Sequence, residues 1–216
     1  LLSKDTLYIY KYNGTKWVIQ KTINPEVQIG TSLAMSRVDS TMIILIGAPN
    51  YSTSQTSGRA LVYSTTDDWG TYNSDILSQP DGVKSNSFFG QSVALDGENA
   101  VISAPGDSTV YYLYNFSGTT WGNSSSIVLP SFIAQFNNYF GSSVKIDNDK
   151  LVVGAKYHSV YKKSDGALFL FNKNINSWNY EKTIIMPNSK ENEYLGEADT
   201  QIAINNKGVA YSIPNS

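Results

Sequence analysis

The sequence predicts an all-β protein built from about four repeats of roughly 50–60 residues. One segment, residues 89–106, starts with Phe-Gly and ends in a small-small-Pro sequence, and this frame returns along the chain. Its glycine recurs every 51 to 60 residues, a period typical of propellers and solenoids, at Gly30, Gly90, Gly141 and Gly196. No stretch of eleven residues combines an apolar helical pattern with caps, which favours strands throughout.

Two strands are expected from each copy of this segment. Residues 140–156 keep the Phe-Gly, a Ser-Val pair and an aliphatic residue before Asp. Residues 29–49 have the same frame with a longer middle, and residues 195–214 have it in a more divergent form. The first strand follows the Phe-Gly, and the second is a short apolar run closed by small residues. Such a run is typical of a strand that is buried on both faces.

Two more strands follow in each repeat. Leu7–Tyr12 alternates apolar with polar or aromatic residues, and Asn13-Gly14 predicts a tight turn before Trp17–Ile23. The same pair recurs at residues 60–63 and 69–77, 110–114 and 121–129, and 167–171 and 178–186. Each fourth strand is expected to open with a tryptophan that covers the seam to the neighbouring unit: Trp17, Trp69, Trp121 and Trp178.

The apolar positions of the first and second strands predict the core. The side chains expected to be buried are Ile44, Ile46, Val93, Leu95, Val101, Val144, Ile146 and Val152. The repeated glycines are expected to let neighbouring backbones approach closely near a crowded centre.

The pairs Phe89-Gly90 with Ser103-Ala104-Pro105, Ile29-Gly30 with Gly47-Ala48-Pro49, and Phe140-Gly141 with Gly154-Ala155-Lys156 resemble FG-GAP repeats. This family includes the β-propeller of integrin α subunits and many extracellular proteins. The fourth copy, Leu195-Gly196 with Ser212-Ile213-Pro214, fits by position. The resemblance implies a β-propeller whose blades are four-stranded antiparallel sheets.

The resemblance also suggests a calcium site, because integrin-like repeats hold Ca²⁺ in the turn between the first two strands. Ca²⁺ needs six to eight oxygen ligands. The turns Asp96-Gly97-Glu98 and Asp147-Asn148-Asp149 are short, and the turn at residues 36–41 has Asp39 alone. The sequence therefore favours structural hairpin turns, with no metal site and no cofactor, although calcium stays open as an alternative.

The repeats divide the chain into 1–25, 26–85, 86–136, 137–191 and 192–216, in which the first and last pieces are half blades. The first piece contributes third and fourth strands, and the last contributes first and second strands. The halves could complete one blade and close a four-bladed ring, or pair between molecules in self-assembly. The interpretation we favour is a single propeller segment that is part of a larger propeller.

Composition limits the partners. The net charge is −2, with no run of Lys or Arg, so no electrostatic footprint for nucleic acid is present. The sequence contains no run of 18 apolar residues, so membrane insertion is not expected. There is no cysteine, so an exported chain of this sequence would be held by its core and by the way its ends are tied down.

Four Asn-x-Ser/Thr sequons are candidate N-glycosylation sites: Asn13, Asn50, Asn115 and Asn123. Asn13 and Asn115 are expected in the same turn, between third and fourth strands, of two repeats, and Asn50 in the loop after Gly-Ala-Pro. All four are expected to be exposed. Together with the family resemblance they predict an extracellular or cell-surface glycoprotein.

The sequence does not indicate catalysis. The single histidine, His158, has no Ser or Cys partner motif, and no Gly-x-Ser-x-Gly sequence occurs. We expect His158 to be a solvated residue of the loop between second and third strands. The sequence therefore predicts no catalytic residues and no enzymatic activity.

The predicted function is a binding, adhesion or structural assembly module with a protein or glycan partner. The alternative is a lectin or carbohydrate-active enzyme on the same scaffold. The loops after the second strands vary in length and chemistry, at residues 50–58, 106–109 and 157–165. The last is the candidate partner-binding loop, with Tyr157, His158, Tyr161, Lys162 and Lys163.

Overall fold

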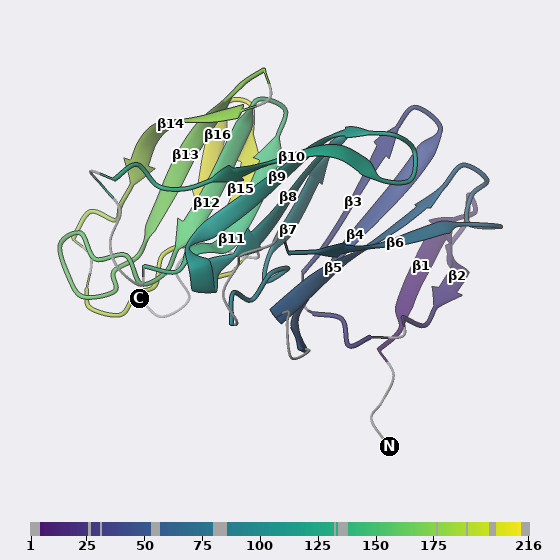
Figure 1. Ribbon diagram of the computed structural model, residues 1–216, viewed down its shortest axis with the longest axis horizontal. Coiled ribbons are helices and arrows are strands. Elements are labelled where there is room, and N and C mark those ends of the chain that lie inside the picture. The colour runs from purple at the N-terminus through teal and green to yellow at the C-terminus, as the bar shows by residue number, and fades with distance from the viewer. Residues whose placement is uncertain are drawn as a thin grey trace.

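The computed structural model describes residues 5–25, 27–30, 32–52, 57–79, 86–131, 133, 138–175, 177–188, 190–198 and 202–212. In these ranges the chain forms five antiparallel sheets and one short 3₁₀ turn, η1 (Pro105–Asp107). Four sheets follow one another across Figure 1, and the fifth packs on the fourth. The all-β prediction is confirmed.

Three sheets are complete blades with their four strands in chain order. They comprise β3 (Leu33–Val38), β4 (Thr41–Ser52), β5 (Ser57–Thr65) and β6 (Asn73–Ser78); β7 (Val93–Asp96), β8 (Asn99–Ala104), β9 (Thr109–Phe116) and β10 (Trp121–Ile127); and β11 (Phe140–Asp147), β12 (Lys150–Ala155), β13 (Ala167–Asn174) and β14 (Ser177–Ile184). We call these blades A, B and C. Four-stranded antiparallel propeller blades are thus confirmed.

The two ends of the chain form two-stranded sheets. One is β1 (Leu7–Tyr12) with β2 (Trp17–Ile23), and the other is β15 (Ile202–Asn205) with β16 (Gly208–Tyr211). These half blades lie at opposite ends of the row (Figure 1). In this structure the two halves do not complete a blade within one molecule, and the sheets are not closed into a ring.

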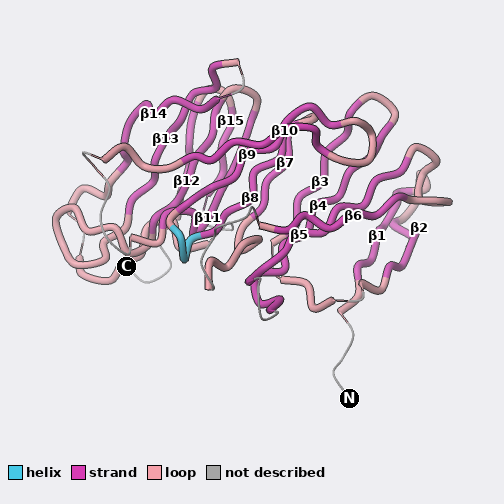
Figure 2. The backbone as a smooth tube through the Cα atoms, in the orientation of Figure 1, coloured by secondary structure: helices cyan, strands magenta, loops and turns pink. Residues whose placement is uncertain are grey.

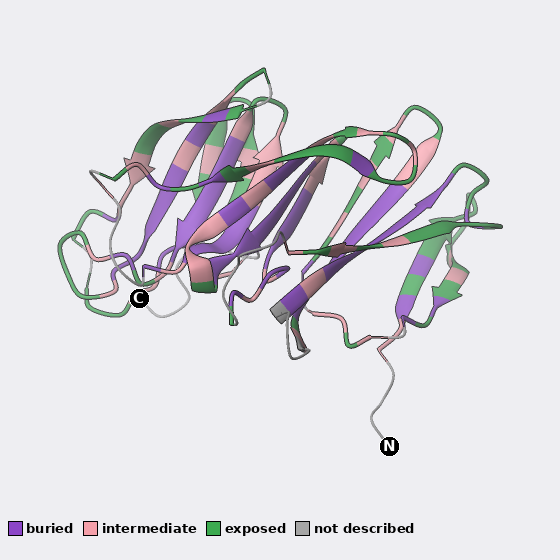
Figure 3. Cartoon of the chain, viewed as in Figure 1, coloured by how far each residue is buried: buried purple, intermediate pink, exposed green. Residues whose placement is uncertain are grey.

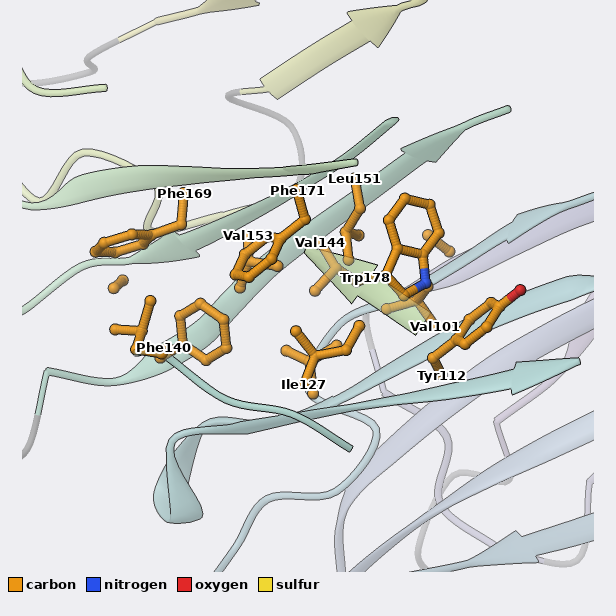
Figure 4. Close-up of a cluster of buried hydrophobic side chains, with 14 of the residues drawn as sticks. Val101, Tyr112, Ile127, Phe140, Val144, Leu151, Val153, Phe169, Phe171 and Trp178 are labelled. Carbon is orange, nitrogen blue, oxygen red and sulfur yellow. The ribbon is translucent and has the colours of Figure 1, made fainter. Parts of the chain in front are cut away.

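Each blade buries apolar side chains on both faces, against its two neighbours. Along β8, Val101 packs toward blade C and Ile102 packs toward blade A. The buried residues therefore run as bands through the inner strands (Figure 3). The cluster between blades B and C is the largest of the described core clusters, and Phe140 packs in it against Phe169 and Phe171 (Figure 4). Six of the eight expected core residues are buried, and Leu95 and Ile146 are partly buried.

The repeated glycines bring neighbouring blades into backbone contact. A Cβ atom on Gly47 would lie 1.9 Å from the Gly90 carbonyl oxygen of the next blade. A Cβ atom on Gly154 would lie 2.3 Å from the Gly196 carbonyl oxygen, which repeats the arrangement one sheet further on. The first residue of one small-residue motif thus contacts the glycine of the next Phe-Gly motif. This contact is why the two motifs occur together.

Serine hydroxyls join the same inner strands. Val93 N donates a hydrogen bond to Ser32 Oγ at 2.7 Å, and Val144 N donates to Ser92 Oγ at 2.9 Å. Ser32 and Ser92 each lie two residues after the repeated glycine, so the bond recurs from blade to blade. All these atoms are buried, so each bond satisfies a polar group that water does not reach.

Three of the four tryptophans are buried at seams, as expected, and one is not. Trp178 contacts Tyr112 of blade B edge to face, with ring centroids 5.5 Å apart. Trp121 and Trp69 likewise belong to clusters shared with the preceding sheet. Trp69 lies in the turn before β6 rather than opening that strand. Trp17 is 68% exposed, because no sheet in the described ranges covers its face of β1 and β2.

The two edges of the row differ. Tight turns between first and second strands, and between third and fourth strands, lie along one edge, the upper one in Figure 2. The longer connections lie along the opposite edge. We call these the hairpin edge and the loop edge. Residues 50–52 and 57–58 extend β4 and β5 at the loop edge, so they are not loop as expected, and residues 53–56 are outside the described ranges.

Candidate functional site

A row of aromatic rings crosses the loop edge from blade B to the last sheet. Phe88, Tyr139 and Tyr194 each directly precede a Phe-Gly or Leu-Gly pair, one per repeat. All three have left-handed backbones, with φ of 56°, 59° and 53°. This uncommon conformation recurs at the same place in each repeat and turns the chain into the first strand. The rings consequently emerge at equivalent points of successive sheets.

Tyr157 links these rings into one continuous row. The ring centroids of Phe88 and Tyr139 are 6.3 Å apart, those of Tyr139 and Tyr157 are 5.4 Å apart, and those of Tyr157 and Tyr194 are 5.8 Å apart. The rings are tilted or edge to face, which are favourable aromatic geometries. We call Phe88, Tyr139, Tyr157 and Tyr194 the aromatic row.

Lys156 supplies the positive charge of the row. Its Nζ atom lies 5.2 Å from the Tyr139 ring centroid and 5.1 Å from that of Tyr157. The same Nζ atom forms an ion pair with Glu197 at 3.4 Å. Burial raises the pKa of the Tyr139 hydroxyl, and the nearby Lys156 charge opposes the rise only in part. Tyr139 is therefore a neutral hydrogen-bonding group at physiological pH.

The loop at residues 157–165 is held in one shape by Asp165. The Asp165 carboxylate is buried and accepts hydrogen bonds from the backbone N–H groups of Val160, Tyr161 and Lys162 at 2.9 to 3.1 Å. Backbone bonds also connect the loop to the segment before the last sheet, from Asn192 N to Lys163 O at 2.9 Å and from Tyr194 N to Ser164 O at 3.2 Å. The loop is therefore ordered before any ligand arrives.

The loop exposes most of the side chains proposed for binding. Tyr157 is 42% exposed and Tyr161 is 66% exposed, and Lys162 and Lys163 are exposed beside them. His158 differs from the expectation of a solvated residue, since it is 5% exposed and its ring contacts Phe169 edge to face. Gly166 N donates a hydrogen bond to His158 O where the loop returns to β13. This tight return places the imidazole under the loop.

His158 makes stability depend on pH. Burial lowers the pKa of His158, and the Asp165 charge opposes this only in part. The folded chain therefore keeps the imidazole neutral where the unfolded chain begins to bind a proton, near pH ~6.5. We expect the free energy of unfolding to fall as pH drops from about 7.5 to about 5.5.

The His158→Gln variant, in which the only titrating imidazole is absent, should show a flatter profile over that range. Urea denaturation at a series of pH values measures the difference. An identical pH dependence in the two proteins would contradict the neutral buried state of His158.

The hairpin edge carries the acidic turns considered for calcium. Asn148 N donates to Asp96 Oδ2 across blades B and C, and Lys173 Nζ donates to Asn99 Oδ1 at 2.9 Å. These contacts use the turn oxygens to join blades. Among the described residues no group of three or more His, Asp or Glu side chains is arranged to hold a metal ion.

All four sequon asparagines are exposed. Asn13 lies in the β1–β2 turn, whereas Asn115 and Asn123 lie in β9 and β10 next to the corresponding turn, and Asn50 lies in β4. Asn115 therefore precedes the turn expected for it. Asn13, Asn115 and Asn123 gather toward the hairpin edge, away from the aromatic row. In the described part of the chain no helix has the length and apolar character needed to cross a bilayer.

Sequence reasoning found the loop but missed Phe88, Tyr139, Tyr194 and Lys156. The available signal was an aromatic residue directly before the repeated Phe-Gly or Leu-Gly pair in three repeats. That position has no apolar periodicity of its own, so strand patterns did not identify it.

Parts of this chain are similar to known proteins. Residues 76–116 and 134–171, which include β7 to β9, β11, β12 and the first part of β13, match the family model of the FG-GAP repeat. Among solved structures, the chain is similar to Trypanosoma rangeli sialidase in complex with sialic acid, at 11% identity and a TM-score of 0.43. The likeness covers 96% of this chain and 38% of the sialidase chain, so this chain spans less than two fifths of that length. No curated protein matches the chain.

Proposed function

Since the chain is an FG-GAP repeat protein, we propose that it is a non-enzymatic binding module that contacts a protein partner through its loop edge. The observation that carries this proposal is the ordered loop at residues 157–165, which exposes two tyrosines and two lysines beside the aromatic row. Tyrosine and basic side chains on a rigid support are typical of energetically important interface residues. Because the loop is already ordered, binding loses little conformational entropy.

A protein is favoured over a glycan by the packing of the rings. Within the aromatic row, neighbouring rings meet edge to face or tilted, so their flat faces are partly covered. Sugar stacking needs an open ring face, whereas a protein side chain can dock against ring edges and hydroxyl groups. The exposed Lys162 and Lys163 add a preference for an acidic partner surface.

We place this module outside the cell or at its surface. The support is the exposure of all four sequon asparagines, three of which lie toward the edge opposite the aromatic row. Glycans attached there would leave the loop edge open to a partner. The non-enzymatic character is supported by the condition of His158, whose imidazole is buried against Phe169 rather than presented to a substrate.

The proposal is tested with fluorescently labelled chain and cells from its natural source. We expect saturable binding that protease treatment of the cells abolishes and glycosidase treatment preserves. The Tyr161→Ser/Lys163→Glu double variant should bind at least about tenfold more weakly, because both side chains are exposed and act only in contact with the partner.

The Lys16→Glu variant is the matched control, since Lys16 is exposed in the β1–β2 turn at the opposite, hairpin edge. Equal binding by the double variant and the wild type would contradict the proposal. Loss of binding after glycosidase treatment alone would identify a lectin, and hydrolysis of a polysaccharide by the pure chain would identify an enzyme.

A further inference from the structure

In the described part of the chain no sheet covers the outer face of the first half blade, which is an apolar surface. Five large side chains of β1 and β2 point to this face and are each more than half exposed: Tyr8 at 55%, Tyr10 at 53%, Tyr12 at 51%, Trp17 at 68% and Ile19 at 55%. A monomer rarely exposes so many aromatic side chains on one sheet unless the sheet has a partner.

The equivalent face of blade C is buried against its neighbouring blade. Aligned on their tryptophans, β1 and β2 match β13 and β14, so that Tyr8, Tyr10 and Trp17 correspond to Phe169, Phe171 and Trp178. Those three residues of blade C are buried against blade B. The outer face of β1 and β2 is therefore a blade-to-blade interface of the type that the chain already uses internally.

The other end of the chain has a matching groove. β15 and β16 cover only the inner half of blade C, through Ile202 against Val152 and Leu168. Beyond them lies a groove with a volume of 390 Å³, lined by Leu170, Ile184, Glu181, Lys182 and Val209. In a complete blade this space is occupied by third and fourth strands, as blades A to C show.

We propose that β1 and β2 of one copy complete the blade begun by β15 and β16 of a second copy. Among the described residues β16 pairs only with β15, and β1 pairs only with β2, so each has an unpaired edge. An unpaired strand edge is a template for pairing with another chain. The edges are complementary, because β16 is a second strand and β1 is a third strand.

The register follows from blade C, where Leu151 pairs with Phe171 and Val152 with Leu170. The equivalent pairs are Val209 with Tyr10 and Ala210 with Ile9. This register places the exposed aromatic face of β1 and β2 over the groove of the second copy. It also places β15 of that copy over Leu33 and Met35, which are 53% and 57% exposed beside the first half blade.

The contact is head to tail, because the two half blades lie at opposite ends of the row (Figure 1). A head-to-tail contact uses two different surfaces, so a joined pair still has one free surface of each kind, one on either copy. The resulting assembly grows into a closed ring or an open chain of copies.

Sedimentation of the 216-residue chain from nanomolar to high micromolar concentration tests the proposal. We expect the average mass to rise with concentration, to that of a dimer if two copies close a ring and beyond it if more copies join. The Tyr10→Glu/Trp17→Glu variant should stay monomeric with an unchanged melting temperature, because both side chains are exposed in the monomer. Val128→Glu is the matched control and should assemble like the wild type.

Cysteine trapping tests the register, since the chain has no cysteine of its own. Mixing a Tyr10→Cys chain with a Val209→Cys chain should give a disulfide-linked pair under mild oxidation, and replacing Val209→Cys by Ala203→Cys should not. A wild-type chain that stays monomeric at all concentrations, or a charged variant that assembles normally, would overturn the proposal. A Tyr10→Cys/Val209→Cys chain that forms its disulfide within one monomer would also overturn it.

Discussion

A single methyl group at Gly47 is expected to destabilise the chain by more than about 4 kcal/mol. Gly47 lies in β4, and a Cβ atom there would be 1.9 Å from the carbonyl oxygen of Gly90 in the next blade. The obstacle is backbone on both sides, so no side chain can rotate away to relieve the overlap. Gly47→Ala therefore forces blades A and B apart where their inner strands meet.

Gly122→Ala is the control for this variant. Gly122 also lies in a strand, β10, but the nearest atom to its added Cβ would be 3.6 Å away, an ordinary contact. We expect a change within about 0.5 kcal/mol for that variant. Urea denaturation compares the two, and a Gly47→Ala chain as stable as Gly122→Ala would contradict the close approach of the blades.

Truncation of Phe140 should give the second large loss, about 3–5 kcal/mol. The Phe140 side chain is fully buried between blades B and C, with ring centroids 5.8 Å from Phe169 and 6.0 Å from Phe171 (Figure 4). Phe140→Ala removes these edge-to-face contacts and leaves a cavity that the surrounding strands cannot close, because both blades are held by their own ladders.

Tyr161→Ala removes a ring of similar size from the loop edge, where it is 66% exposed. Its expected effect on stability is within about 0.5 kcal/mol, so the pair separates core packing from surface exposure. Thermal and urea denaturation measure both. A loss below about 1 kcal/mol for Phe140→Ala would show that blades B and C do not share this core.

Strand positions could be predicted because the same apolar pattern and turn residues recur in each repeat. Three of these signals are local: the alternation in β1, the apolar run of β8 and the Asn13-Gly14 turn. Each depends only on neighbouring residues, so the sequence alone predicts it. The position of Trp69 in a turn was not predictable, since β6 begins four residues after its tryptophan, whereas β2 and β10 begin at theirs. The exposure of Trp17 depends on whether an earlier sheet exists, which no residue near Trp17 specifies.

Loop contacts were harder to foresee than strands. His158 was expected to be a solvated loop residue, but the loop folds over it because the Asp165 carboxylate accepts three backbone N–H groups three to five residues away. The aromatic row joins residues from three repeats through Tyr157, and this proximity exists only once the sheets are stacked. Turns such as Asp147-Asn148-Asp149 were correctly expected to be tight hairpins, because their length is a local property.

Lysine footprinting of the chain bound to cells tests directly whether the loop edge is the binding surface. The chain is acetylated while bound and while free, at concentrations too low for self-assembly, and the modified lysines are identified by mass spectrometry. Lys162 and Lys163 report on the loop edge, and Lys16, exposed in the β1–β2 turn, reports on the hairpin edge. We expect Lys162 and Lys163 to be protected in the bound chain and Lys16 to react equally in both states. Protection of Lys16 with Lys162 and Lys163 still reactive would contradict it.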